Sequence, residues 1–371
     1  MNEITAASLA PTVAWGAFIL AFIFGAAAQR SNFCTMGAVS DVVNIGDWTR
    51  MRMWLTAMAV AILGANALQL AGLIDLSKSL YQTPSFTWLS YIVGGLAFGF
   101  GMALGSGCGS KTLIRIGAGN LKSVVVALAL GISAYMTLKG LFAVWRVAYL
   151  DPVSFTMAGT QDLPSLLTRA LGGDKKTWQI GASLVVAGLL LAFSLKSEDF
   201  RKLDTIAMSA LIGATIVGGW YVSGKIGYVS EDPTTLQEAF AATNSGRMES
   251  FSFVAPIAYT LELLMFWSDK SKIVSFGVAA ALGVIAGSFA YSIATKSFRW
   301  EGFRDAEDTA NHLVGGALMG FGGVTALGCT VGQGISGIST LALGSFITVA
   351  AIIVGAMAAF KYQYWRAESG T

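Results

Sequence analysis

The chain has 371 residues, of which 54% are hydrophobic and only 12% are charged, with a net charge of +3 at neutral pH. A soluble domain carries about twice this charged fraction. Together with a mean hydropathy of +0.64, this composition excludes a soluble globular protein and predicts an all-α polytopic membrane protein. The basic residues form no patch with interleaved aromatic residues, so no nucleic-acid partner is expected.

Apolar segments follow one another along the chain, and a helix that spans the bilayer needs about 20 such residues. We expect a single integral membrane transport domain over residues 1–371, with roughly nine or ten transmembrane helices plus re-entrant half-helices. The candidate spans are Pro11–Ala28, Met53–Ile74, Leu89–Gly105, Lys122–Trp145, Trp178–Leu195, Thr205–Val222, Pro256–Trp267, Ile273–Ile293, His312–Gly328 and Leu341–Phe360.

The segments between the spans differ in charge. The positive-inside rule predicts that the short basic loops Lys196–Lys202 and Ser268–Lys272 and the basic tail face the cytoplasm. The long mixed-charge segments Arg146–Thr177 and Ser223–Ala255 then lie outside. The same scheme puts Arg299 and Arg304 outside, which leaves the orientation open.

Two stretches of the chain repeat each other. Gly94–Cys108 reads GGLAFGFGMALGSGC and Gly315–Cys329 reads GGALMGFGGVTALGC, with seven identities in fifteen positions at a constant offset of 221 residues. Glycine-rich helices resemble each other by composition, but a shared terminal cysteine makes that explanation weak. Duplicated halves are typical of transporters. We therefore expect two pseudo-symmetric, inverted repeats at about 11–145 and 205–364, with a linking helix at about 178–195.

All three cysteines lie where an apolar run stops and small polar residues begin. The motifs are SNFCTMG around Cys34, GSGCGSK around Cys108 and GCTVGQG around Cys329. Without a C-x-x-C pair, and with one histidine in the chain, no metal site and no cofactor are expected. A lone cysteine is usually a small buried hydrophobe. The shared setting of these three instead favours a solute pathway lined by thiols and by backbone N–H groups of half-helices.

Neighbours of the cysteines complete the predicted pathway. Lys111 follows Cys108 closely and is expected at the mouth, where a full positive charge attracts an anion without trapping it. Gln333 and Asn120 are alternatively helix caps, Lys139 and His312 are expected to reach the interface, and Glu262 is expected to pair with a base or to couple an ion. The predicted pathway residues are Cys34, Cys108, Cys329, Thr35, Gly107, Gly109, Ser110, Lys111, Gly328, Thr330, Gly332 and Gln333.

At these motifs the chain resembles the YeeE/YedE family of bacterial sulfur-transport membrane proteins. The resemblance rests on RSNFCTMGAVSD, GFGMALGSGCGSKTLIRIGAGNLKS and GFGGVTALGCTVGQGISGIS, and with the repeat it covers most of the chain. It implies thiosulfate uptake through an hourglass of two inverted halves, with Cys34, Cys108 and Cys329 along the path. It also implies that a TusA-like small sulfur-carrier protein takes over the solute on the cytoplasmic side.

The sequence thus predicts a multi-pass protein of the bacterial inner membrane that carries thiosulfate through the lipid bilayer and is not an enzyme. Neutral thiols would pass the anion between weak sites, as conduction requires. Another sulfur or selenium species, such as sulfite, sulfide or selenite, is the main alternative. A membrane sulfurtransferase is the weaker one, because a nucleophilic cysteine needs an activating base or a positive field.

Overall fold

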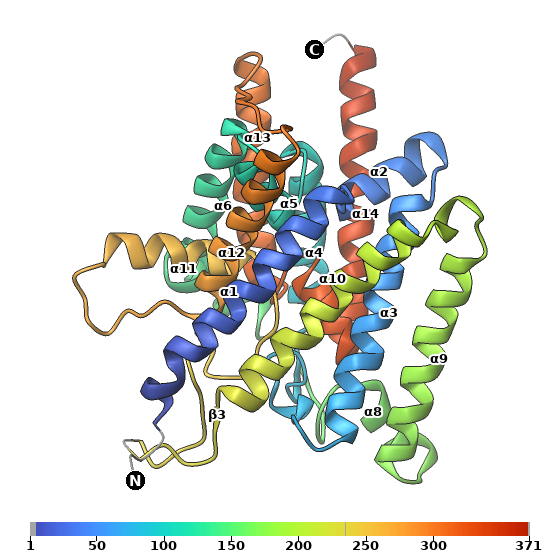
Figure 1. Cartoon of the computed structure of the whole chain (residues 1–371), viewed down its shortest axis with the longest axis vertical. Helices are drawn as coiled ribbons and strands as arrows, with labels where there is room; N and C mark the ends of the chain where they lie inside the picture. The colour runs from blue at the N-terminus through green and yellow to red at the C-terminus, as the bar shows by residue number, and fades with distance from the viewer. Residues whose placement is uncertain (1–4, 234, 370–371) are drawn as a thin grey trace.

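The computed structural model describes residues 5–233 and 235–369, and nearly all of its ordered elements are helices (Figure 1). Eight helices in this part of the chain are long and apolar enough to span a membrane. The all-α polytopic class is therefore confirmed. The eight are α1 (Ala6–Arg30), α3 (Thr49–Leu70), α4 (Trp88–Leu104), α6 (Leu121–Lys139), α9 (Lys175–Leu195), α10 (Leu203–Tyr221), α12 (Phe276–Ala294) and α14 (Leu343–Ser369).

Shorter elements fill the space between the spans. Two small antiparallel pairings join β1 (Ser85–Phe86) to β2 (Phe155–Thr156), and β3 (Tyr228–Val229) to β4 (Ala239–Phe240). The remaining helices are α2 (Thr35–Ile45), α5 (Gly109–Gly117), α7 (Leu141–Trp145), α8 (Leu163–Leu171), α11 (Val254–Met265) and α13 (Ala306–Thr325). Single helical turns are η1 (Leu76–Lys78), η2 (Arg146–Leu150), η3 (Asp199–Arg201), η4 (Val222–Ile226) and η5 (Gly332–Gly337).

Three predicted spans differ in detail from the observed helices. The predicted span Lys122–Trp145 is interrupted at Gly140, between α6 and α7. The predicted span Pro256–Trp267 becomes α11, which has 12 residues and is too short to cross the bilayer. Helix α13 begins at Ala306, before the predicted start at His312, because the Asp305 side chain caps its first turn.

Contrary to the prediction from their charge, the two basic loops do not lie on the same side of the protein. The backbone N–H of Phe276 donates to the carbonyl of Ala242 at 2.8 Å, which puts the Ser268–Lys272 loop beside the long polar segment 223–255. Helix α10 separates this segment from Lys196–Lys202. The prediction that Ser268–Lys272 and Lys196–Lys202 share a side is therefore wrong, because α11 turns back without crossing.

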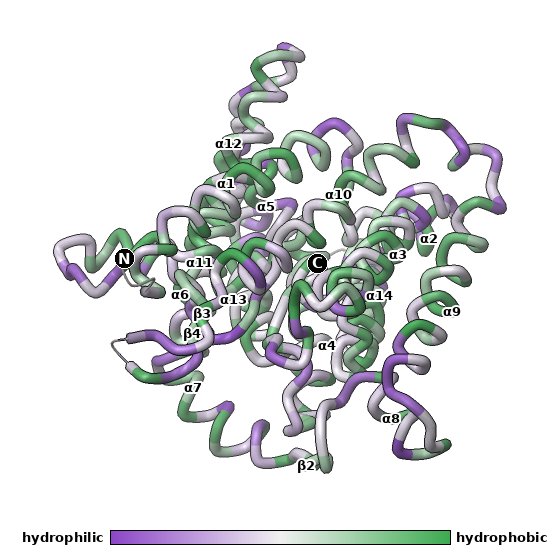
Figure 2. Tube along the Cα trace, turned by 60° about the horizontal axis from the view of Figure 1, so that its bottom comes forward, coloured by the Kyte–Doolittle hydropathy of each residue, from purple (hydrophilic) through white to green (hydrophobic). Residues whose placement is uncertain are grey.

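Helices from the two halves of the chain pack against each other in matching pairs. Helix α1 packs on α12 and α3 on α10; likewise α4 packs on α14 and α6 on α13. In the repeat alignment α3 matches α12, α4 matches α13 and α6 matches α14. The contact of α4 with α14 therefore has its counterpart in the contact of α6 with α13. Figure 2 shows the polar residues gathered mainly in the loops around this helical body.

Helices α4 and α13 meet in the middle through glycines. A Cβ atom added at Gly94 would lie 2.8 Å from the carbonyl oxygen of Gly322, and one added at Gly315 would lie 2.7 Å from that of Gly101. Gly94 and Gly315 are repeat equivalents, as are Gly101 and Gly322. The two helices therefore run antiparallel, and glycine is required because their backbones nearly touch.

Candidate functional site

Each cysteine follows a sharp break at the end of a long helix. Helices α1, α4 and α13 are each followed by a residue with left-handed backbone, and the cysteine comes two residues after it. Such a residue lets N–H groups close back onto the last helical carbonyls, as in a Schellman motif. The left-handed residues are Asn32 (φ 51°), Ser106 (φ 56°) and Leu327 (φ 58°). The closing bonds run from Phe33, Gly107 and Gly328 to Ala28, Met102 and Gly323 at 3.0, 2.9 and 2.8 Å.

The Cys34 thiol caps α2, and the Cys329 thiol accepts a similar bond in the turn that leads into η5. The backbone N–H of Gly37 donates to the Sγ atom of Cys34 at 3.3 Å, and that of Gly332 donates to the Sγ atom of Cys329 at 3.4 Å. Cys108 stands at the same position before α5, where its Sγ atom lies 3.2 Å from the hydroxyl of Ser110. All three thiols therefore lie at helix N-termini, where the helix dipole favours negative charge.

The three thiols form a series through the centre of the protein. The Cys108 thiol is close enough to interact electrostatically with those of Cys34 and Cys329. Cys329 in turn interacts with the hydroxyl of Tyr81. All three cysteines are buried. The order of groups is therefore Cys34, Cys108, Cys329 and Tyr81, from one side of the protein toward the other.

A basic cavity of about 680 Å³ begins at Cys34, and we call it the arginine cavity. Its charged lining is four cations and one carboxylate, so its electrostatic potential attracts anions. The Arg50 guanidinium is held by both carboxylate oxygens of Asp41, and that of Arg115 donates to the Ser106 carbonyl at 2.7 Å. The charged lining residues are Arg50, Lys111, Arg115, Arg299 and Glu301.

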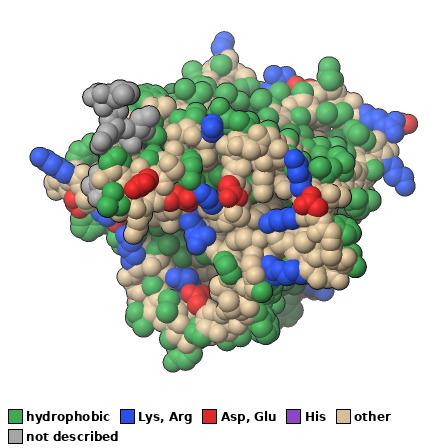
Figure 3. All heavy atoms as spheres, turned by 90° about the horizontal axis from the view of Figure 1, so that it is seen from below, with side chains coloured by type: hydrophobic (Ala, Val, Ile, Leu, Met, Phe, Trp, Pro, Cys, Tyr) green, Lys and Arg blue, Asp and Glu red, His purple; other side chains and the backbone are tan. Residues whose placement is uncertain are grey.

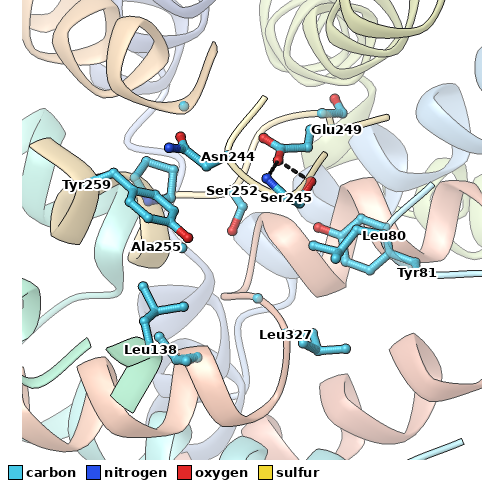
Figure 4. A pocket seen from close by; sticks show the side chains of 16 residues that line it. Leu80, Tyr81, Leu138, Asn244, Ser245, Glu249, Ser252, Ala255, Tyr259 and Leu327 are labelled. Atoms are coloured by element: carbon cyan, nitrogen blue, oxygen red, sulfur yellow. Dashed lines mark hydrogen bonds between the residues drawn. The ribbon is translucent and has the colours of Figure 1, made fainter. Parts of the chain in front are cut away.

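A second cavity, of about 160 Å³, begins at Gly328 beside Cys329, and we call it the tyrosine cavity. Tyr81, Tyr259 and Glu249 line it together with serines (Figure 4). The Glu249 carboxylate accepts hydrogen bonds from the backbone N–H of Ser245, at 3.0 Å, and from its hydroxyl. No ion pair with Glu249 is found among the described residues.

Residues 30–358 match the sulphur transport family. The chain belongs to this family. It is 26% identical to the thiosulfate transporter TsuA of Escherichia coli (strain K12), over 93% of both chains. It is 24% identical to the thiosulfate transporter TsuA of Spirochaeta thermophila, over 92% of this chain and 96% of that protein. Membership of the sulphur transport family makes the chain a multi-pass transport protein, not an enzyme.

Within this sulphur transport protein, the predicted pathway residues fall into three groups. Cys34 and Lys111 line the arginine cavity, and Gly328 lines the tyrosine cavity. The others line neither cavity and are buried. This buried group is Thr35, Gly107, Cys108, Gly109, Ser110, Cys329, Thr330, Gly332 and Gln333.

Two polar residues beside Cys329 differ in whether the hydrogen-bonding groups of their side chains are already occupied. The Gln333 amide donates to the Ala326 carbonyl at 2.5 Å and accepts from the Ser345 hydroxyl at 2.6 Å, so it fixes η5 to its neighbours. The Thr330 hydroxyl, in contrast, is buried and has no hydrogen-bond partner in the described structure. A buried polar group of this kind requires an explanation, and Thr330 is free to bind a solute.

The sequence analysis did not identify Tyr81, Glu249, Arg50 or Arg299 as site residues. Tyr81 and Glu249 belong to loops, and Arg50 follows a loop between two helices. None of them lies within ten residues of a cysteine in the sequence. The available signal was the position of Arg299 and Arg304, which the positive-inside rule placed outside and therefore did not explain.

Proposed function

We propose that this member of the sulphur transport family carries thiosulfate across the bacterial inner membrane. The observation that carries the proposal is the series of three buried thiols between two cavities, one beginning at Cys34 and the other beside Cys329. Two relatives that align over most of the chain are named thiosulfate transporters, which supports the choice of solute.

The chemistry of thiosulfate suits this path. It is a dianion whose terminal sulfur is soft and weakly hydrated. Burying such a charge costs several kcal/mol unless donors replace its water. Backbone N–H groups at the breaks stabilise the oxygens, and the thiols of Cys34, Cys108 and Cys329 donate weakly to the sulfur. The thiols work in the neutral form, because a thiolate would repel the dianion.

The arginine cavity faces the cytoplasm in this proposal. Arg50, Arg52, Arg299 and Arg304 belong to loops or helix ends on that side, and the positive-inside rule assigns such segments to the cytoplasm. The opposite face carries acidic and basic side chains intermixed (Figure 3). A TusA-like sulfur carrier would then take thiosulfate over from the arginine cavity, and that cavity's positive charge favours an acidic partner surface.

The two halves, about 11–145 and 205–364, are inverted repeats in this proposal, with α9 as the link near 178–195. The matching contacts of Gly94 with Gly322 and of Gly315 with Gly101 support it. Equivalent helices that pack antiparallel are related by a twofold axis perpendicular to both helices. For membrane-spanning helices, that axis lies in the membrane plane.

The test is growth on thiosulfate as sole sulfur source, in a bacterium that lacks its own thiosulfate uptake. Cells carrying the wild-type chain should grow, and cells carrying Cys108→Ala at equal membrane expression should not. A matched control is Gly188→Ala on α9, which leaves every cysteine in place. Equal growth of the Cys108→Ala cells would disprove the thiol pathway.

Uptake of labelled thiosulfate in the same cells identifies the solute. Competition by sulfite, sulfide, sulfate or selenite in excess over thiosulfate would assign the path to that species instead. A persulfide trapped on Cys108 would revive the sulfurtransferase alternative. Uptake that requires a co-expressed sulfur-carrier protein would establish the partner.

A further inference from the structure

A third cavity, of about 320 Å³, lies on the side of the protein away from the arginine cavity, and we call it the lysine cavity. Lys139, at the end of α6, and Lys272, before α12, extend into it from different parts of the chain. Both ammonium groups contact one oxygen of Glu262 on α11, Lys139 at 3.1 Å and Lys272 at 2.7 Å. Glu262 thus pairs with basic residues, one of the roles expected for it.

The lysine cavity adjoins the tyrosine cavity. Asn244 and Tyr259 line both of them. In Figure 4 these two side chains lie on one side of the tyrosine cavity, across from Tyr81 and Glu249. A solute that leaves the lysine cavity past Asn244 and Tyr259 therefore arrives in the space that begins at Gly328, beside Cys329.

The charges that line the lysine cavity do not cancel. Two lysines share one carboxylate, which leaves one surplus positive charge. The Glu262 side chain is only 7% exposed, whereas those of Lys139 and Lys272 are 50% and 32% exposed. Asp269, on the neighbouring turn, accepts from the backbone N–H of Ser271 and does not line the cavity. Solute that comes from solvent therefore meets the ammonium groups before the carboxylate.

The remaining lining offers hydrogen bonds suited to an oxyanion. Ser271 and Ser275 contribute hydroxyl groups and Asn244 contributes an amide, whereas the Thr243 hydroxyl already donates to the Phe240 carbonyl. An ammonium group carries three N–H donors, so Lys139 and Lys272 each keep donors beyond the bond to Glu262.

We propose that the lysine cavity is an anion-recruiting site at the outer mouth of the pathway, where Lys139 and Lys272 bind the doubly charged sulfur oxyanion before it enters the tyrosine cavity. This inference rests on the proposed function. Glu262 sets the strength of the site, because it offsets one of the two positive charges and so keeps the anion from being held too tightly to move on.

The test is the concentration dependence of labelled thiosulfate uptake in cells that lack their own uptake system. Lys139→Gln and Lys272→Gln should each raise KM roughly three- to tenfold with an unchanged maximal rate, because electrostatic capture changes arrival more than passage. The rise of the wild-type KM with added salt should weaken in both variants. Lys270→Gln is the matched control, since Lys270 lies on the same loop but not in the cavity.

Glu262→Gln gives the opposite expectation. The amide oxygen still accepts a hydrogen bond from a lysine, but the negative charge is gone, so KM should fall below the wild-type value. If KM in Lys139→Gln and Lys272→Gln equals that of Lys270→Gln, the inference is wrong. A lower maximal rate at constant KM shows a packing role and overturns it as well. Absence of saturable uptake by the wild-type chain would defeat the proposed function itself.

Discussion

The Sγ atom of Cys329 accepts a hydrogen bond from the backbone N–H of Gly332 at 3.4 Å. This contact closes the turn that leads into η5 and fixes the direction of the thiol at once. A cysteine in this position therefore has a structural role, shared with any good capping residue, and a chemical role that only sulfur provides. The two roles can be separated by substitution.

Cys329→Ser should fold as well as the wild type, because a serine hydroxyl caps a helix well, whereas Cys329→Ala should lose about 1 kcal/mol of folding free energy. Both variants should lose most thiosulfate uptake, since neither has a polarizable sulfur. Thermal unfolding in detergent and uptake in cells measure the two effects separately. Wild-type uptake by Cys329→Ser would show that the sulfur atom is dispensable.

The close glycine contacts between the two halves should leave no room for a larger side chain. A Cβ atom at Gly99 would lie 2.0 Å from the carbonyl oxygen of Ile352, and one at its repeat equivalent Gly320 would lie 2.3 Å from that of Leu130. We expect Gly99→Ala and Gly320→Ala each to destabilise the protein by about 1–3 kcal/mol, the usual cost of overpacking.

The control for this pair is Gly188→Ala, because no atom lies within 4 Å of a Cβ added there. Alanine is favoured over glycine within a helix by about 1 kcal/mol, so this variant should be as stable as the wild type or more stable. Thermal unfolding of Gly99→Ala, Gly320→Ala and Gly188→Ala in one detergent measures these differences in stability. Equal stability of Gly99→Ala and Gly188→Ala would contradict the close approach of α4 and α14.

Thr330→Val removes the unpartnered hydroxyl beside Cys329 with little change of volume. Since the hydroxyl has no hydrogen-bond partner in the described structure, folding stability should stay within about 1 kcal/mol of the wild type or increase. Uptake should fall if the hydroxyl binds the passing solute. The comparison is Thr348→Val on α14, a second buried hydroxyl without a partner. Equal uptake by the two variants would remove Thr330 from the pathway.

Glu249 should make uptake depend on pH. Withdrawal from water raises the pKa of its carboxyl group, against the opposing effect of the hydrogen bonds from Ser245 and Asn244. Below this pKa the group is neutral, and above it a negative charge faces the incoming dianion. Wild-type uptake should therefore fall as the pH rises through the raised pKa.

Two tyrosines are the titratable groups that interact with Glu249, and neither complicates the test. Burial raises the pKa of Tyr259 to about 12 and also raises that of Tyr81, so both stay protonated in the useful pH range. Glu249→Gln should show a flat profile with higher uptake at alkaline pH. Glu238 pairs with Lys78 and accepts from the Tyr228 hydroxyl but does not line the tyrosine cavity, so Glu238→Gln should keep the wild-type profile. A pH-dependent Glu249→Gln variant would argue against this role.

The sequence by itself determined the class of the protein and the location of the cysteine breaks. Hydropathy is a local property, and each of the eight long apolar helices in the described residues overlaps a predicted span, although nine or ten crossings were expected. The breaks before Cys108 and Cys329 were also visible, because small residues interrupt an apolar run at the same place in both copies of the repeat. A prediction from local hydropathy also failed here. The segment Lys122–Trp145 was predicted as one span because it is predominantly apolar, yet its helix is interrupted at Gly140.

Only the tertiary structure decided which of these breaks meet and what surrounds them. Cys34 and Cys329 are almost 300 residues apart, and their common approach to Cys108 depends on α4, α6, α13 and α14 packing through glycines. Tyr81, Glu249 and Lys272 come from loops that carry no hydropathy signal. The sides of these loops depend on whether α11 crosses the bilayer, and the structure shows that this short helix packs on α6 and α12.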